Sequence, residues 1–409
     1  MTVSAPPRRP SPARTVPDNR LLLDREEVEA LVEALIEEAR RETRRRHQRY
    51  CALAALVAFV GVVVLVLLDG GAASRTAPAA VPARSSVPAG VGSSQIAFMR
   101  DPDGDGQFVG DTQLWVMNTD GSGQRQLTPA ARFGSWSPDG RMIAFSSVRR
   151  GNRDIYVMRS DGSHERRLTR SAADEWSAAL WSPSGQKLAF ARNSDVYVMN
   201  ADGSGEHKLT SGPARDLAPS WSPDGRKLLF RRDHGGLRSL ELAQLYVMNA
   251  DGSGLRALTP EWDLHGAGSW SPDGRKIVFS RSRDGNSDVY AMNADGTGVR
   301  RLTSGSGMDY IPVWSPDGRR IAFLGGPFGE REVWVMNANG SVKRKLTRRE
   351  AGPDIPVSWS PDSRTIAYSS WRDGNWEIYE VNADGQGLRN LTQKPGDDIA
   401  PSWSARRGS

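Results

Sequence analysis

The feature that most constrains this chain is a repeat near 44 residues long that recurs seven times. Each unit begins with a Trp-Ser pair and ends with a Leu-Thr pair, and successive Trp-Ser pairs are 45, 40, 49, 44, 45 and 44 residues apart. A regular period of this length is typical of propellers and solenoids, in which each unit buries its apolar face against the next. The tryptophans of these pairs are Trp136, Trp181, Trp221, Trp270, Trp314, Trp359 and Trp403.

The unit over residues 270–303 predicts four short β-strands per repeat. Residues 271–274 (Ser-Pro-Asp-Gly) are typical of a type I turn, because proline presets φ and glycine suits the exit. Residues 277–279 and 289–292 are β-branched and aromatic runs of strand length. Asp295-Gly296 favours a tight hairpin between the third and fourth strands. Seven such units predict an all-β fold, a seven-bladed β-propeller of four-stranded antiparallel blades.

The two ends of the repeat region predict how the ring closes. The segment that starts at Gln95 begins with a second strand, because no Ser-Pro-Asp-Gly turn precedes it. Residues 400–404 supply a first strand with no second strand after it. We therefore expect residues 400–404 to complete the blade of residues 95–128, which leaves no exposed sheet edge. The propeller then spans residues 95–404, and residues 405–409 form a short tail.

The repeat WSPDGRKIVFS…DVYAMNADGTGVRRLT resembles that of the TolB-type β-propellers. Similar repeats occur in the N-terminal propellers of prolyl oligopeptidase relatives. The resemblance covers about three-quarters of the chain and implies the fold, but propellers host binding, scaffolding and catalysis alike. TolB itself has six blades and an additional N-terminal α/β domain, so its partners are not carried over to this chain.

The sequence before residue 95 predicts a tail, two helices and a tether. Residues 1–20 are rich in Pro, Arg and Ser and are expected to be disordered. Residues 21–50 predict a cytoplasmic amphipathic helix with one apolar stripe, which either binds a partner or extends the helix that follows. Residues 69–94 form a Pro/Ala/Ser linker.

Residues 51–68 predict a transmembrane helix. They are 18 uncharged, apolar residues, which at about 1.5 Å per residue approach the thickness of the hydrocarbon layer. Six arginines crowd the preceding segment and Asp69 follows, so the positive-inside rule places the N-terminus in the cytoplasm. We expect a single-pass protein of the cell membrane with an extracytoplasmic propeller. Cleavage after the small residues that follow Leu68 is the alternative.

A ring of acidic residues is predicted at one mouth of the central channel. The position five residues before each Trp-Ser pair lies in the loop that enters a blade, and Asp174, Glu175, Asp263 and Asp397 add acid nearby. Such a concave ring attracts a cation or a basic peptide. The alternative is that each aspartate caps its own loop through backbone amides. The seven residues at this position are Ala131, Trp176, Asp216, His265, Asp309, Asp354 and Asp398.

Two further candidate sites lie in loops. Asp101, Asp103 and Asp105 recur at alternate positions before Gly106, like the start of a calcium-binding loop. Thr112 stands where the bidentate glutamate would be, with Asp111 beside it, so the alternatives are a looser calcium site or a plain Asp/Gly hairpin loop. The repeated tryptophans predict blade packing. Those outside the repeat pattern are candidates for sugar or peptide contact, and they are Trp176, Trp262, Trp371 and Trp376.

Catalysis and nucleic-acid binding find little support. The chain has no Gly-x-Ser-x-Gly motif and no room beside the propeller for a hydrolase domain. The oligogalacturonate lyases, whose repeats are similar, need several clustered histidines, whereas only His265, and His234 beside it, are expected near the mouth. The net charge is only +6, and the repeated arginines indicate a solvated outer face rather than a nucleic-acid surface.

Three functional hypotheses follow from these features. The first is a non-enzymatic module that binds another envelope protein or peptide through the acidic mouth. The second is a glycan or cell-wall sensor that signals through the membrane helix. The third is a metal-dependent polyuronate lyase-like enzyme. The first accounts for most of the observations.

Overall fold

A computed structural model describes residues 94–104, 112–149, 152–171, 179–234, 243–260, 263–283, 286–305, 307–326, 331–347 and 354–405. The predicted tail (1–20), amphipathic helix (21–50), membrane helix (51–68) and nearly all of the linker (69–94) lie outside these residues, as do residues 406–409. The described part of the chain contains no helix with the length and hydropathy that a membrane crossing requires.

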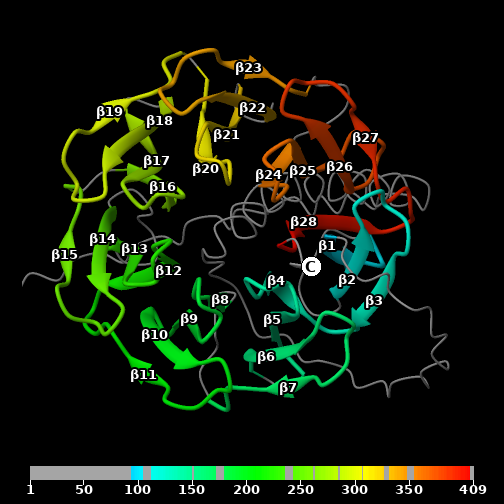
Figure 1. The fold of residues 1–409 in the computed structure, drawn as a ribbon, viewed down its shortest axis with the longest axis horizontal. Helices are drawn as coiled ribbons and strands as arrows, with labels where there is room; N and C mark the ends of the chain where they lie inside the picture. Colours follow the sequence, from blue (N-terminus) through cyan, green and yellow to red (C-terminus); the bar gives the residue numbers. More distant parts are fainter. Residues whose placement is uncertain are drawn as a thin grey trace, which may run out of the picture. The chain divides into compact units, whose positions relative to one another are not determined.

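Seven four-stranded antiparallel sheets are arranged in a ring (Figure 1). Blade 1 consists of β28 (Asp397–Trp403), β1 (Gln95–Asp101), β2 (Gln113–Asn118) and β3 (Arg125–Thr128), and blade 2 of β4 (Arg132–Trp136), β5 (Met142–Ser147), β6 (Asp154–Arg159) and β7 (Arg166–Arg167). Blade 3 consists of β8 (Leu180–Trp181), β9 (Lys187–Arg192), β10 (Asp195–Asn200) and β11 (His207–Lys208), and blade 4 of β12 (Arg215–Trp221), β13 (Lys227–Asp233), β14 (Ala243–Asn249) and β15 (Arg256–Ala257). Blade 5 consists of β16 (Asp263–Trp270), β17 (Lys276–Arg283), β18 (Asn286–Asn293) and β19 (Arg300–Arg301), and blade 6 of β20 (Tyr310–Trp314), β21 (Arg320–Gly325), β22 (Glu332–Asn337) and β23 (Arg344–Lys345). Blade 7 consists of β24 (Asp354–Trp359), β25 (Thr365–Ser370), β26 (Glu377–Asn382) and β27 (Arg389–Asn390).

The ring closes by the predicted strand exchange between the two ends of the propeller. The C-terminal strand β28 is the innermost strand of blade 1 and pairs antiparallel with β1, with Ile96 opposite Trp403 and Arg100 opposite Asp398. The prediction of seven blades closed by the C-terminal strand is therefore confirmed. This closure covers the inner edge of β1, which would otherwise be open to pairing with another chain.

The apolar core lies between neighbouring blades. One buried cluster joins Ile155 and Val157 of blade 2 to Leu188, Phe190 and Met199 of blade 3, and the other blades meet through similar clusters. Alternation along the strands places these side chains on both faces of each sheet, so each blade needs a neighbour on both sides.

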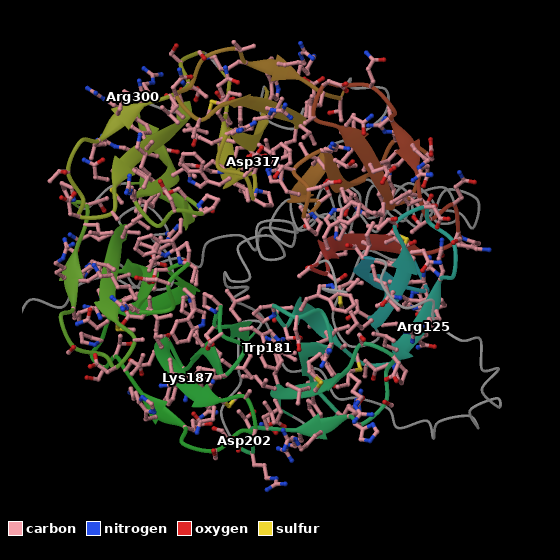
Figure 2. The ribbon with its side chains drawn as sticks, in the orientation of Figure 1. Arg125, Trp181, Lys187, Asp202, Arg300 and Asp317 are labelled. Carbon is pink, nitrogen blue, oxygen red and sulfur yellow. The ribbon has the colours of Figure 1, made fainter. Side chains whose placement is uncertain are left out.

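The Trp-Ser tryptophans join each blade to the one before it. The indole Nε1 of Trp181 donates a hydrogen bond of 3.2 Å to the carbonyl oxygen of Ser135 on the inner strand of blade 2. Trp221, Trp359 and Trp403 repeat this bond, and Trp136 donates to Ser402, 3.0 Å away across the closure. Trp181 lies on the inner side of the ring in Figure 2. The prediction that these tryptophans pack blade against blade is confirmed.

The other repeated residues have local roles. In six blades the Leu-Thr hydroxyl accepts the backbone N–H of a third-strand residue, as in the 2.9 Å bond from Val289 to Thr303. In the Ser-Pro-Asp-Gly turns, the serine hydroxyl bonds the aspartate, as Ser271 does Asp273 at 2.6 Å. Gly274 adopts φ of 69°, a left-handed conformation that favours glycine.

Fourth-strand arginines join the blades at the outer rim. Arg300 donates to the carbonyl oxygen of Asn339 in the next blade at 2.8 Å, and Arg125, Arg256, Arg344 and Arg389 make the same kind of contact. Arg125 and Arg300 lie on the outside of the ring in Figure 2. The recurrence of these cations therefore has a structural cause.

We predict that Trp136→Phe destabilises the chain more than Trp270→Phe does. Trp136 loses its bond to Ser402, worth about 1 kcal/mol. The buried Nε1 of Trp270 has no partner among the described residues, so phenylalanine there removes an unsatisfied donor that costs about 1–3 kcal/mol. Urea unfolding of the purified full chain measures both changes. Equal losses would show that the indole bond does not contribute to ring closure.

Candidate functional site

The structure places three of the predicted mouth aspartates in equivalent backbone positions. The backbone N–H of Asp216 donates to the carbonyl oxygen of Ser194 at 2.7 Å, that of Asp309 to Ser287 at 2.7 Å and that of Asp398 to Trp376 at 2.6 Å. Each acceptor lies at the start of the third strand in the preceding blade, so the three side chains start from the same place in their blades. Ala131 is buried at the corresponding position of blade 2. The side chains of His265 and Asp354, and all of Trp176, lie outside the described residues.

Asp398 forms a buried ion pair with Arg100. Its two carboxylate oxygens accept hydrogen bonds from Nε and Nη2 of Arg100, both at 2.6 Å, and the aspartate is fully buried. Burial raises the pKa of Asp398 to about 6, and the bonds from Arg100 oppose that shift. The carboxylate is therefore neutralised within the blade rather than presented to the channel.

Asp216 repeats this arrangement in blade 4. Nε and Nη2 of Arg232 donate to its two oxygens at 2.6 and 2.7 Å, and Asp216 is 1% exposed. The hydrogen bonds to Asp216 raise the pKa of Arg232. Both aspartates thus differ from the expected open acidic ring and from the alternative in which they cap their loops.

Arginines lie over an aromatic pair in six of the seven blades. Every blade packs an aromatic ring of its second strand against one of its third, with centroids between 5.6 and 6.5 Å apart. The guanidinium carbon of Arg100 lies 4.4 Å from the Trp115 ring centroid, and that of Arg232 lies 4.4 Å from Tyr246, distances typical of cation–π contacts. The arginines of the other four blades are Arg149, Arg192, Arg281 and Arg372.

Blade 6 differs at this position. Its pair, Phe323 and Trp334, has Gly325 where blades 1 and 4 have Arg100 and Arg232. A Cβ atom on Gly325 would lie 2.7 Å from Oδ1 of Asp309, so the carboxylate lies directly over the glycine. Burial raises the pKa of Asp309, and the charge of Asp288 adds to this shift. A hydrogen bond with Thr303 and the charges of Lys343 and Arg301 oppose it.

The arginine positions could have been found in the sequence. Blades 1, 3, 4 and 5 carry Phe-x-Arg on the second strand, and blades 2 and 7 carry the arginine two residues later. In blade 6 these two positions are Gly325 and Pro327. The sequence does not show that the arginine and the mouth aspartate are neighbours in space. Only the pairing of the first strand with the second brings the two side chains together.

The candidate loop aromatics are placed differently from one another. Trp376 is 2% exposed and belongs to the buried cluster formed by residues of blades 1 and 2, so it does not present a face to a ligand. Trp371 is half-buried and meets Trp376 edge-on, with centroids 5.7 Å apart. Trp262 lies outside the described residues.

The candidate calcium loop is described only in part. Asp101 is buried, and its Oδ1 accepts the backbone N–H of Asp103 at 3.3 Å. Asp105 and Asp111 lie outside the described residues. Within the described ranges, no group of three or more His, Cys, Asp or Glu side chains is arranged to hold a metal ion. His234, the histidine expected near the mouth, is exposed and bonds Gln244 at 2.8 Å.

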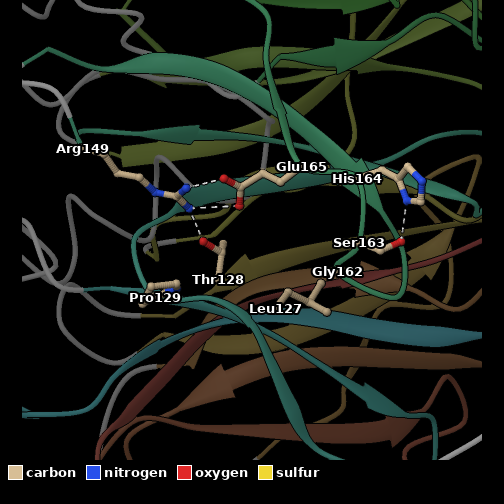
Figure 3. A pocket seen from close by; sticks show the side chains of 8 residues that line it. All are labelled: Leu127, Thr128, Pro129, Arg149, Gly162, Ser163, His164 and Glu165. Atoms are coloured by element: carbon tan, nitrogen blue, oxygen red, sulfur yellow. Dashed lines mark hydrogen bonds and ion pairs between the residues drawn. The ribbon is translucent and has the colours of Figure 1, made fainter. Parts of the chain in front are cut away.

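A groove of about 640 Å³ lies between blades 1 and 2, between residues 127–129 and residues 162–165 (Figure 3). Arg149 crosses it and bonds Glu165 and Thr128. His164 faces Ser163 at 3.0 Å in the turn between the third and fourth strands. Because Arg149 is already held by Glu165, the groove has no unpaired charge from this arginine to offer a ligand.

Comparisons with known proteins agree with this architecture. A family model described as the TolB beta propeller domain matches residues 171–263, 262–352 and 306–409. No curated protein matches the sequence.

Several solved structures are similar in fold. TolB from Acinetobacter baumannii is 21% identical, with a TM-score of 0.52 over 76% of this chain and 67% of its own. An oligogalacturonate lyase from Vibrio parahaemolyticus is 15% identical, with a TM-score of 0.55 over 74% of this chain and 86% of its own. A puromycin-hydrolyzing peptidase from Mycobacterium tuberculosis is 14% identical, with a TM-score of 0.60 over 73% of this chain and 52% of its own. This chain therefore spans about half the length of the peptidase.

We predict that Arg232→Met destabilises the chain by about 3–5 kcal/mol, because it leaves the buried carboxylate of Asp216 without its cation. The double variant Asp216→Leu/Arg232→Met should lie closer to the wild type, since it removes both charges. Arg319→Met, at an exposed position, serves as the control and should change stability by less than about 0.5 kcal/mol. Urea unfolding measures the free energy of unfolding of each variant. A double variant that is no more stable than Arg232→Met would contradict this account of the ion pair.

Proposed function

Because this chain belongs to the TolB β-propeller family, we propose that it is a membrane-anchored, non-enzymatic protein-binding module of the cell envelope. In this proposal residues 51–68 cross the membrane once, the N-terminus is cytoplasmic, and the propeller lies outside the cytoplasm and binds another envelope protein or a peptide.

The observation that carries the binding role is the closed seven-blade ring. Its inner strands are joined by indole hydrogen bonds and its rim by arginine contacts, so loops from all seven blades are held on one stiff frame. A rigid scaffold that presents many loops on one face suits recognition, because little order has to be gained on binding. The apolar run 51–68 and the arginines before it support the membrane anchor.

The similar enzymes do not favour catalysis in this chain. At 15% and 14% identity, the likeness to the lyase and to the peptidase concerns the fold alone. Of the three described mouth aspartates, two are already paired with arginine, which suits a structural role better than acid–base chemistry.

We predict that protease added to intact spheroplasts digests the propeller and leaves the N-terminal segment protected. The full chain carries a different epitope tag at each end, and immunoblotting follows both. Lysed cells are the control, in which the N-terminal tag should also become sensitive. A propeller protected in intact spheroplasts would contradict the extracytoplasmic placement.

We also predict that the full chain, cross-linked in the envelope and purified, retains an envelope protein that a matched bait of residues 1–94 does not. The retained protein must then rebind the purified full chain. Retention of no protein, together with release of unsaturated uronate from oligogalacturonate, would overturn the binding proposal in favour of a lyase.

A further inference from the structure

We propose that blade 6 carries a recognition slot for a guanidinium group, formed by the Asp309 carboxylate beside the Trp334 ring, which receives an arginine side chain of the partner. This proposal rests on the proposed function, because it assigns the chemistry of the protein or peptide that the propeller binds.

Asp309 occupies the same place in its blade as the two aspartates that are paired with arginine. The backbone of Asp309 is anchored to the preceding blade at the same point as those of Asp216 and Asp398. The Phe323–Trp334 pair is stacked at 6.2 Å, close to the 5.8 Å of Phe230–Tyr246 in blade 4. The walls that hold Arg232 in blade 4 are therefore present in blade 6.

Blade 6 lacks the arginine that the other six blades place over their aromatic pairs. Six blades supply their own arginine to the aromatic pair, whereas blade 6 has Gly325 and Pro327 at the two positions from which those arginines come. Arg331, just before the third strand, lies over Tyr310 instead, with its guanidinium carbon 5.2 Å from that ring centroid. Among the described residues, no arginine or lysine is ion-paired with Asp309.

The ion pairs around Asp309 differ from those around Asp216. In blade 4, Asp195 of the preceding blade pairs with Lys208 and Asp216 pairs with Arg232. At the corresponding place in blade 6, Asp288 pairs with Arg301 at 2.5 Å, and Asp309 makes no ion pair within the described part of the chain. The charges of Lys343 and Arg301 act on Asp309, but neither forms an ion pair with it in the described part of the chain. This place therefore has one ion pair fewer than its counterpart, and a half-buried carboxylate gains from a cation that is brought into contact with it.

An unsatisfied donor marks the same place. The indole Nε1 of Trp334 is buried and has no hydrogen-bond partner within the described residues, and it would lie 3.1 Å from a Cβ atom on Gly325. The equivalent indole in blade 1, Trp115, donates to Gln113 at 2.8 Å. A bound arginine residue brings a guanidinium for Asp309 and a main-chain carbonyl as an acceptor for this N–H.

The chemistry favours arginine over other cations. A planar guanidinium forms two parallel hydrogen bonds to a carboxylate while its face rests on an aromatic ring. Arg100 and Arg232 do both at once within this chain. An ammonium group provides the charge but not the paired, planar contact.

The slot is tested with N-acetyl-arginine amide as the probe and the purified full chain in detergent, by isothermal titration calorimetry. The neutral isostere N-acetyl-citrulline amide and N-acetyl-lysine amide are the comparison ligands. We expect saturable binding of one arginine amide, weakened about tenfold or more in Asp309→Asn and for citrulline. Binding should also shift the indole N–H resonance of Trp334 in a tryptophan-labelled chain, assigned with Trp334→Phe.

Gly325→Arg is the matched gain-of-residue variant. It gives blade 6 the arginine that blades 1 and 4 already carry. A new Cβ would meet the Asp309 carboxylate, which is the mobile end of a side chain, and would lie 3.0 and 3.1 Å from two atoms of the Trp334 indole, which has to shift by a few tenths of an ångström. We expect this variant to keep a cooperative thermal unfolding transition, which shows that it is folded, and to lose arginine-amide binding. It decides the question even if Asp309→Asn fails to fold.

The outcomes separate this inference from the proposed function. Equal affinities for arginine, citrulline and lysine amides, or unchanged binding in Gly325→Arg, would overturn the slot. A partner protein that binds Gly325→Arg as tightly as it binds the wild type would support the proposed binding function but would show that the slot does not contribute to it. If the chain binds arginine amide but retains no envelope protein, the slot is supported and the proposal of an envelope partner is contradicted.

Discussion

The packing of each Trp-Ser indole against the preceding blade is the interaction on which the ring depends, and five of the seven indoles also donate a hydrogen bond to that blade's inner strand. A single blade is apolar on both faces and cannot bury them alone, so its stability comes from its neighbours. The indole fixes the distance and rotation between successive inner strands while its ring fills the space between two sheets. Since Trp136 makes the same bond to the C-terminal strand β28, the two ends of the propeller are held by the interaction that joins the other blades.

The buried ion pairs follow from that geometry. Where an inner strand begins, the chain passes the edge of the second strand in its own blade and the start of the third strand in the blade before it. An aspartate at this point is removed from water, and a buried carboxylate is costly unless it has a cation and hydrogen bonds. Arg100 and Arg232 meet both needs and rest on an aromatic pair that is itself part of the repeat. Blade 6 keeps the aspartate and the rings without the arginine, and in this it differs from blades 1 and 4.

The basic residues of the chain illustrate the same dependence on neighbours. Arg125, Arg300 and their equivalents recur at the start of the fourth strand because each reaches a backbone carbonyl in the next blade. Other cations pair with third-strand acids, as Arg167 does with Asp154 at 2.6 Å. These basic side chains therefore contact other parts of the ring, either a carbonyl oxygen of the next blade or an acid on an adjacent strand.

The sequence by itself determined the repeat, the number of blades, the strand order and the closure by β28, because turn residues and alternating apolar runs act locally and recur seven times. It also predicted the packing role of the repeated tryptophans. It did not predict that Trp376 is buried or that Asp216 and Asp398 are neutralised. Those outcomes depend on which side chains meet across strands and blades that are far apart in the chain, as Arg100 and Asp398 do. Only the tertiary structure brought the aspartate, the arginine and the aromatic pair together, and so made the absence of an arginine at Gly325 meaningful.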